Sequence, residues 1–267
     1  MHGCLLELGQ TGRCRARRDE HGRIISINYG KLTSIALDPI EKKPLAMFCP
    51  GSMILSVGSF GCNMDCQFCQ NDSISMASEN EITTRYVAPD ELAEYASQLR
   101  QKGNIGIAYT YNEPMIGFEY VRDTASIAHR QGMKNVVVTN GAVSLPVLDE
   151  VLPYIDAYNI DLKGITETYY KKLGGDLKTV QRFIIKAVAH AHVELTTLIV
   201  PDENDSVDEI AELSSWVASV DEKIPLHITR FFPRRKMLDK EPTDIALLYK
   251  LWNVAKKSLQ NVFVGNV

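Results

Sequence analysis

The sequence predicts an α/β fold: an open partial (β/α)6-type barrel of parallel strands, preceded by a short N-terminal segment that contains β structure. From Met53 onward, short apolar runs that are typical of buried strands alternate with longer stretches that are typical of helices. The links between them are short, and such alternation places parallel strands in one sheet with helices outside. The predicted strands are one short of the eight that a closed barrel needs, so the barrel should be open.

The predicted core strands are Met53–Gly58, Ile105–Thr110, Asn135–Thr139, Ala157–Asp161, Glu194–Val200, Leu226–Phe231 and Val262–Val264. The predicted helices are Pro89–Lys102, Ile116–Gln131, Leu145–Leu152, Leu177–Ala191, Val207–Val220 and Asp244–Leu259. Proline suits a first helical turn, as at Pro89, and Ser206 with Glu209 forms a capping-box pattern. Nothing in residues 51–267 marks a linker, so we expect one core domain there.

Residues 1–50 are predicted to form a separate N-terminal segment. Within it, Arg23–Gly30 and Leu32–Leu37 have the pattern of two short strands joined at Gly30-Lys31 as a β-hairpin. Cys4 and Cys14 flank a turn-rich stretch. Two thiols alone make a poor metal site, so free thiols are favoured for both, and metal ligation is the alternative.

Composition and charge limit the classes of partner. The 267 residues carry a net charge of −4, with 45% hydrophobic and 23% charged residues, which is ordinary for a globular protein. That balance favours neither nucleic acid nor an anionic membrane surface as a partner. No apolar run approaches the ~20 residues that a membrane helix needs. A reducing cytoplasm is the expected compartment.

Three of the six cysteines fall within one short loop that directly follows the strand Met53–Gly58. Cys62, Cys66 and Cys69 have the spacing C-x3-C-x2-C. Three such thiolates can hold three corners of a cubic iron–sulfur cluster, and without a fourth cysteine nearby one iron stays open, as catalytic sites require. Phe68 would shield one side of the cluster. A zinc-binding interaction protein and a plain iron–sulfur electron carrier are the rival classes, although the fourth ligand that each needs is missing locally.

Polar residues follow several predicted strands, where parallel α/β folds bind ligands. Glu113 stands after the second core strand and could equally cap the next helix. Thr139 and Asn140 end the third strand, where an Asx-type turn is the alternative explanation. Asp161 and Lys163 end the fourth strand and alternate onto one face, where they could neutralise each other or bind a ligand.

The stretch from Gly61 to Asn71 resembles the signature of radical S-adenosylmethionine (SAM) enzymes. It is similar to the branch that includes pyruvate formate-lyase activating enzymes, and more narrowly to the radical SAM member of the AmmeMemoRadiSam system. The resemblance implies a [4Fe–4S] cluster on Cys62, Cys66 and Cys69, SAM bound beside it, and an oxidoreductase in which Lys163 assists catalysis.

The resemblance also implies which side chains contact the cofactors. Asn112 and Glu113 occupy the family's position for the SAM amino group, and Lys163 the position near the SAM carboxylate. The whole implied set is Phe68, Asn112, Glu113, Thr139, Asn140, Asp161, Lys163, Val200 and His227. For Val200 an ordinary strand end before a proline is an equally good explanation, and for His227 the alternative is a core histidine.

The implied reaction is one-electron cleavage of SAM to methionine and a 5′-deoxyadenosyl radical, which abstracts hydrogen from a substrate. Reduced flavodoxin or ferredoxin is the implied electron donor. The substrate stays open between a glycine Cα of a partner protein, as in glycyl-radical enzyme activation, another protein site, and a small metabolite.

Overall fold

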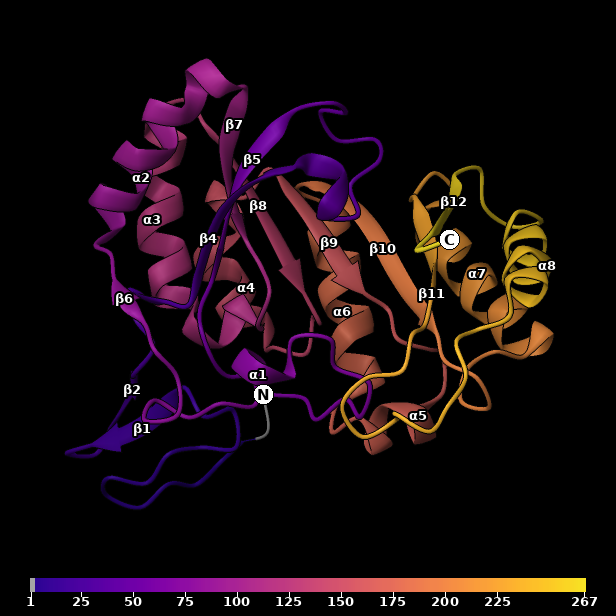
Figure 1. Ribbon diagram of the computed structural model, residues 1–267, viewed down its shortest axis with the longest axis horizontal. Coiled ribbons are helices and arrows are strands. Elements are labelled where there is room, and N and C mark those ends of the chain that lie inside the picture. Colours follow the sequence, from indigo (N-terminus) through magenta and orange to yellow (C-terminus); the bar gives the residue numbers. More distant parts are fainter. Residues whose placement is uncertain (1–2) are drawn as a thin grey trace.

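The computed structural model describes residues 3–267, and Met1 and His2 of the predicted N-terminal segment lie outside the described part (Figure 1). Its centre is an eight-stranded sheet with the strand order β12-β11-β10-β9-β8-β7-β5-β4. The strands are β4 (Ser34–Pro39), β5 (Met53–Gly58), β7 (Asn104–Tyr109), β8 (Lys134–Thr139), β9 (Ala157–Asp161), β10 (His192–Ile199), β11 (Leu226–Arg230) and β12 (Val262–Gly265). All neighbours pair in parallel except β4, which runs antiparallel to β5 at one edge.

Helices link the consecutive parallel strands, as in repeated β/α units (Figure 1). They are α2 (Pro89–Gln98), α3 (Phe118–Arg130), α4 (Leu145–Val151), α6 (Leu177–Val188), α7 (Val207–Asp221) and α8 (Ile245–Ala255). Two short helices were not predicted, α1 (Asp72–Ser75) and α5 (Glu167–Lys172). Ser206 is the N-cap of α7 and accepts a hydrogen bond from the backbone N–H of Glu209, but the Glu209 carboxylate accepts from the N–H of Ile165 at 3.4 Å, so only half of the predicted capping box is present. The predicted open α/β barrel of parallel strands is confirmed, with β12 added after six β/α units.

The predicted N-terminal hairpin is wrong. β2 (Arg23–Ser26) pairs instead with β1 (Arg17–Glu20), and β3 (Lys31–Leu32) pairs with β6 (Arg85–Tyr86). The second predicted hairpin strand corresponds to β4, which pairs along its whole length with β5 of the core sheet. A local hairpin would have left the outer edge of β5 with unpaired backbone groups, and β4 satisfies them.

The amino-terminal end of the barrel is closed by the segment between β4 and β5, which lies across the strand ends opposite α1 (Figure 1). Ile40 and Leu45 are fully buried there. The segment is held by Glu194 of β10, a fully buried carboxylate that accepts hydrogen bonds from the backbone N–H groups of Ala46 and Met47 at 2.9 and 2.8 Å.

Two histidines complete this contact at the closed end. The Nε2 atoms of His192 and His227 lie 2.9 and 2.6 Å from the two oxygens of Glu194. Burial opposes the charge of Glu194, but hydrogen bonds from the two histidines and from the backbone of Ala46 and Met47 lower its pKa to about 2. The ionised carboxylate therefore stabilises the closed end of the barrel.

Within residues 3–267 the helices are all too short or too polar to cross a bilayer.

Replacing Glu194 by Gln should lower the free energy of unfolding by about 2–5 kcal/mol at neutral pH, because buried N–H groups lose charged acceptors. Glu150→Gln, at a half-exposed carboxylate, should cost no more than about 0.5 kcal/mol. The pKa of Glu194 lies below its ordinary value of 4.5. The stabilisation by its ionised carboxylate is therefore complete above pH 4.5 and is lost as the pH falls toward 2. Urea titrations at about pH 6 and about pH 3 measure this. An equal cost at both values would contradict the account.

Candidate active site

A cavity of about 360 Å³ lies at the carboxyl-terminal end of the barrel and gathers most of the predicted site residues. The three cysteines come from the loop after β5, and the polar residues come from the ends of β7, β8 and β9. The predicted residues that line it are Cys62, Cys66, Phe68, Cys69, Asn112, Glu113, Thr139, Asn140, Asp161 and Lys163. Residues separated by a hundred positions in the sequence thus share one cavity.

Val200 and His227 are not among the residues that line this cavity. Val200 is fully buried beyond the end of β10, where its backbone N–H donates to Asn204 Oδ1 at 2.7 Å. His227 bonds to Glu194 at the closed end, two residues before Thr229, which does line the cavity. The roles predicted for Val200 and His227 toward SAM stay predictions.

Several cavity residues were not predicted from the sequence. Thr196, Leu198 and Thr229 line it from β10 and β11, and Lys42 lines it from the segment that closes the barrel. The two-residue alternation Glu194-Thr196-Leu198 could have identified the β10 residues, because alternate side chains of a strand face one side. No local signal marks Lys42, which reaches the cavity only through the path of the chain after β4.

The backbone of the cysteine loop is fixed by close packing at its start. Gly61 has a φ of +87°, and a Cβ added there would lie 2.4 Å from the carbonyl oxygen of Cys14, so no other residue fits. The Asn112 side chain accepts from the N–H of Ser59 and donates to the carbonyls of Phe60 and Gly61. Asn112 therefore positions the loop with the same amide that was predicted to contact SAM.

Two further contacts hold the middle of the loop. Asn140 Nδ2 donates to Asn63 Oδ1 at 2.9 Å and lies 3.6 Å from the sulfur of Cys62. Arg235, in the connection between β11 and α8, donates from Nη1 to the Cys66 carbonyl at 2.8 Å and forms an ion pair with Asp65 at 2.6 Å. Arg235 was not predicted, because 169 residues separate it from Cys66 and its surroundings contain no motif.

The cysteine thiols are buried in this site. Burial raises the pKa of Cys62 above its usual range and that of Cys66 to about 11, although the charges of Lys163 and Arg235 favour the Cys66 thiolate. In the described part of the chain, no three His, Cys, Asp or Glu side chains converge tightly enough to hold a single metal ion.

The other three cysteines, Cys4, Cys14 and Cys49, are free thiols outside this cavity.

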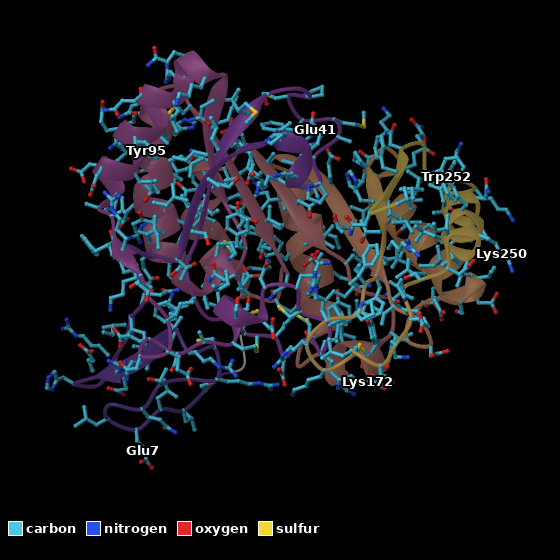
Figure 2. The ribbon with its side chains drawn as sticks, viewed as in Figure 1. Glu7, Glu41, Tyr95, Lys172, Lys250 and Trp252 are labelled. Carbon is cyan, nitrogen blue, oxygen red and sulfur yellow. The ribbon has the colours of Figure 1, made fainter. Side chains whose placement is uncertain are left out.

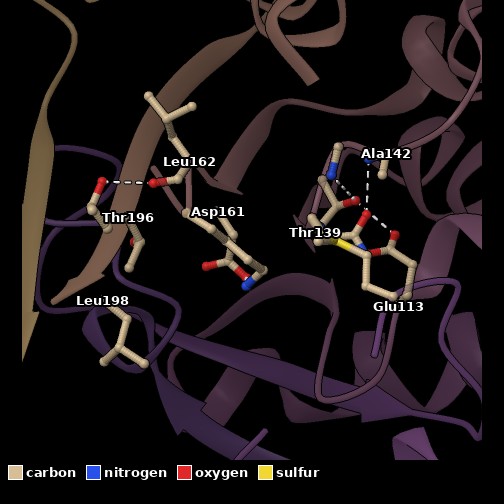
Figure 3. Close-up of polar contacts among 12 residues, drawn as sticks. Glu113, Thr139, Ala142, Asp161, Leu162, Thr196 and Leu198 are labelled. Carbon is tan, nitrogen blue, oxygen red and sulfur yellow. Dashed lines mark hydrogen bonds and ion pairs between the residues drawn. The ribbon is translucent and has the colours of Figure 1, made fainter. Parts of the chain in front are cut away.

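Glu113 is buried at the centre of the polar side of the cavity (Figure 3). Its carboxylate accepts hydrogen bonds from Thr139 Oγ1 at 2.6 Å, from the N–H of Asn140 at 2.7 Å and from the N–H of Met115 at 3.0 Å. The bond from Met115 is the helix-cap contact that was the alternative explanation, so Glu113 caps a helical turn and lines the cavity as well. Burial raises its pKa to about 7 despite these donors.

Lys163 and Asp161 form an ion pair of 2.9 Å, and Figure 3 shows Asp161 between Glu113 and the side chains of Thr196 and Leu198. Burial works against the charge of Lys163, but attraction to Asp161 and to Cys66 raises its pKa above the usual range. The ammonium also lies 5.8 Å from the centre of the Phe68 ring. A permanent cation thus stands between the cysteine loop and the end of β9.

Comparison with known proteins shows the family. The model of the radical SAM superfamily matches residues 56–214. An uncharacterised protein of Methanocaldococcus jannaschii, MJ0808, is 38% identical over 99% of this chain and 79% of its own length. Pyruvate formate-lyase 1-activating enzyme of Escherichia coli is 27% identical over 62% of this chain and 71% of its own. The chain belongs to the radical SAM superfamily, and it is a radical SAM enzyme similar to pyruvate formate-lyase activating enzymes.

Solved structures support the fold. Streptococcus suis SuiB, in complex with the precursor peptide SuiA, matches 78% of this chain and 47% of its own chain with a TM-score of 0.61 at 14% identity. Members of this superfamily in general use a [4Fe–4S] cluster and SAM, and the donor set described above fits both. The recognition of the family from the cysteine loop is confirmed.

The raised pKa of Glu113 predicts a pH dependence of stability. The folded state holds the Glu113 proton more tightly than the unfolded chain, so the free energy of unfolding should rise as the pH falls from 8 through 7. The rise should approach about 1.4 kcal/mol per pH unit below pH 7 and should be absent in Glu113→Gln. Glu91→Gln, at a half-exposed carboxylate, should keep it. Parallel pH curves for wild type and Glu113→Gln, measured on cluster-free protein, would contradict the assignment.

Proposed function

We propose that this enzyme binds a [4Fe–4S] cluster through Cys62, Cys66 and Cys69 and uses it to cleave SAM into methionine and a 5′-deoxyadenosyl radical that abstracts hydrogen from a substrate. The observation that carries the proposal is that the three thiols line one cavity together with Glu113 and Lys163. Soft thiolates are suitable cluster ligands, and the cavity lining contains no fourth cysteine and no histidine in the described part of the chain. One iron would therefore stay open for SAM.

When bound, the cluster would supply the single electron that breaks a C–S bond of the sulfonium group. The residues of the chain would orient SAM for that step. The Glu113 carboxylate would accept from the SAM ammonium, and the Lys163 ammonium would pair with the SAM carboxylate, which is supported by their lining the same cavity as the thiols. Each of these charges is buried and already held by neighbours, so little reorganisation accompanies binding.

The remaining polar groups would fix the nucleoside part. Thr139 and Asn140 lie beside Glu113 at the end of β8, near the position expected for the ribose and carboxylate of SAM. Asp161 faces the same cavity beside Lys163. The enclosing wall formed by Phe68, among other residues, would exclude water from a radical that reacts with most C–H bonds.

An electron carrier without a bound cosubstrate is the weaker alternative. A carrier needs a closed cluster and no cavity beside it, whereas here polar side chains from three strand ends, charged ones among them, line the space next to the thiols.

We infer that the substrate is a site on another protein, and that a reduced flavodoxin or ferredoxin supplies the electron. The similarity to pyruvate formate-lyase activating enzymes supports this inference, because the names of those relatives state that they act on an enzyme. The sequence shows no second small-molecule motif beside the residues expected to bind SAM. A glycine Cα of a partner protein is the specific site that we propose.

Replacing Cys62, Cys66 or Cys69 singly by Ala should remove most of the bound iron and sulfide and abolish formation of 5′-deoxyadenosine. Each thiolate would ligate one iron, and among residues 3–267 the cavity offers no other cysteine to replace it. Cys14→Ala and Cys49→Ala, at free thiols outside the cavity, serve as matched controls and should keep both. Iron and sulfide analysis after anaerobic reconstitution, with quantification of 5′-deoxyadenosine, measures the effect. A cavity-cysteine variant with wild-type cleavage would overturn the proposal.

The class of substrate can be tested by fractionation. Candidate partner proteins encoded near the gene and a protein-free metabolite extract are added separately to the reduced, reconstituted enzyme with SAM. A partner protein should stimulate 5′-deoxyadenosine formation and acquire a glycyl radical signal in electron paramagnetic resonance. Stimulation by the metabolite fraction alone would mean that the substrate is small.

A further inference from the structure

The outer side of the cysteine loop carries an excess of positive charge, although the chain as a whole has a net charge of −4. Asp65, the residue before Cys66, lies 2.6 Å from Arg235 and 3.7 Å from Lys236. Arg13 is also close enough for its charge to act on Asp65. Three cations face a single carboxylate, so the surface around it keeps net positive charge.

These cations come from three separate parts of the chain. Arg13 belongs to the N-terminal segment, and its guanidinium packs against Gly174, where an added Cβ would clash with it at 2.4 Å. The adjacent Leu173 accepts a hydrogen bond from the backbone N–H of Asp65 at 2.8 Å. Arg235 and Lys236 belong to the long connection between β11 and α8, which runs beside α5 at the end of the molecule where α1 lies (Figure 1).

We call Arg13, Arg234, Arg235 and Lys236 the basic rim. Arg13, Arg234 and Lys236 are exposed, and only Arg235 is largely covered. Figure 2 shows Lys172 of α5 at the same end of the molecule, and it pairs with Glu203 at 2.9 Å, so it neither adds to nor cancels the charge of the rim. The acidic residues of the connection, Asp239, Glu241 and Asp244, come only after Lys236 in the chain.

The basic rim lies directly behind a cysteine of the candidate site. Arg235 reaches through to the Cys66 carbonyl at 2.8 Å, and the backbone N–H of Lys236 donates to the Gln67 carbonyl at 2.9 Å. The rim is therefore separated from the thiol of Cys66 by little more than the cysteine loop itself. The same connection also exposes Leu238, which is 70% accessible and offers an apolar contact beside the charges.

We propose that the basic rim is the docking surface for a small acidic electron-carrier protein, which delivers one electron through the cysteine loop. This inference rests on the proposed function and names the partner of its reductive step. The carrier loses one electron and the enzyme gains one, so the transfer needs no further reactant. Opposite charges steer such encounters and make the association rate fall with ionic strength. The enzyme as a whole is acidic and would repel an acidic carrier. The basic rim would attract the carrier, and it lies on the side of the enzyme where the cysteine loop is.

The test measures the rate at which reduced flavodoxin, as an acidic carrier, reduces the reconstituted enzyme. The variant Arg13→Gln/Lys236→Gln removes two exposed charges and leaves the backbone bond of Lys236 and the contacts of Arg235 in place. Its second-order rate should be lower on the order of 10-fold at about 20 mM salt, and the difference should shrink at about 500 mM. The control Lys102→Gln/Lys250→Gln removes the same charge at exposed positions outside the rim, Lys250 being on α8 (Figure 2), and should match wild type.

A small chemical reductant separates docking from damage to the site. With photoreduced deazaflavin, the rim variant should form 5′-deoxyadenosine at the wild-type rate. The electron paramagnetic resonance spectrum of its reduced cluster should also match that of wild type. An unchanged rate with flavodoxin would overturn the docking proposal, as would an equal loss with both reductants. Failure of wild-type enzyme to cleave SAM with any reductant would instead overturn the proposed function.

Discussion

The structure depends on how a loop without regular secondary structure is held so that three thiols face one cavity. Its backbone forms no ladder with the sheet, so each polar group needs another partner. Asn112 and Asn140 bond to it from the ends of β7 and β8, and Arg235 bonds to it from the other end of the sheet order. The barrel thus fixes the loop from both sides, so the proposed cluster would enter a site that is already formed.

Ionising the buried acidic side chains of the cavity costs free energy, and a bound ligand of the right charge would lower that cost. The Cys62 and Cys66 thiols have raised pKa values, and Glu113 has a pKa of about 7, all chiefly because they are buried. A bound cluster would take the thiolates, and a cationic ammonium would favour the ionised Glu113. The protein therefore gives up stability at these positions in exchange for affinity, as active sites commonly do. Glu194, fully ionised at the opposite end, provides stability that the active end lacks.

The core strands and helices could be predicted from sequence because their patterns are local. Periodicity located β5 and β9 at their observed bounds, and the spacing of Cys62, Cys66 and Cys69 led to the family. The N-terminal strands could not be paired correctly. Whether β4 pairs with its neighbour in the sequence or with the free edge of β5 depends on tertiary structure, which a local pattern does not contain. His227 was expected beside SAM only from the family resemblance, and its bond to Glu194 is the kind of core contact that was the alternative explanation. Arg235 and Lys42 reach the site only through tertiary structure.

The central claim is that the cluster has an open iron to which SAM binds through its amino acid part. Electron–nuclear double resonance on the reduced, reconstituted enzyme, with SAM labelled with nitrogen-15 at the amino group, tests it most directly. The account predicts a hyperfine coupling between the labelled nitrogen and the cluster that is lost in the absence of SAM. A cluster spectrum that SAM leaves unchanged, with no coupling to the label, would contradict the account.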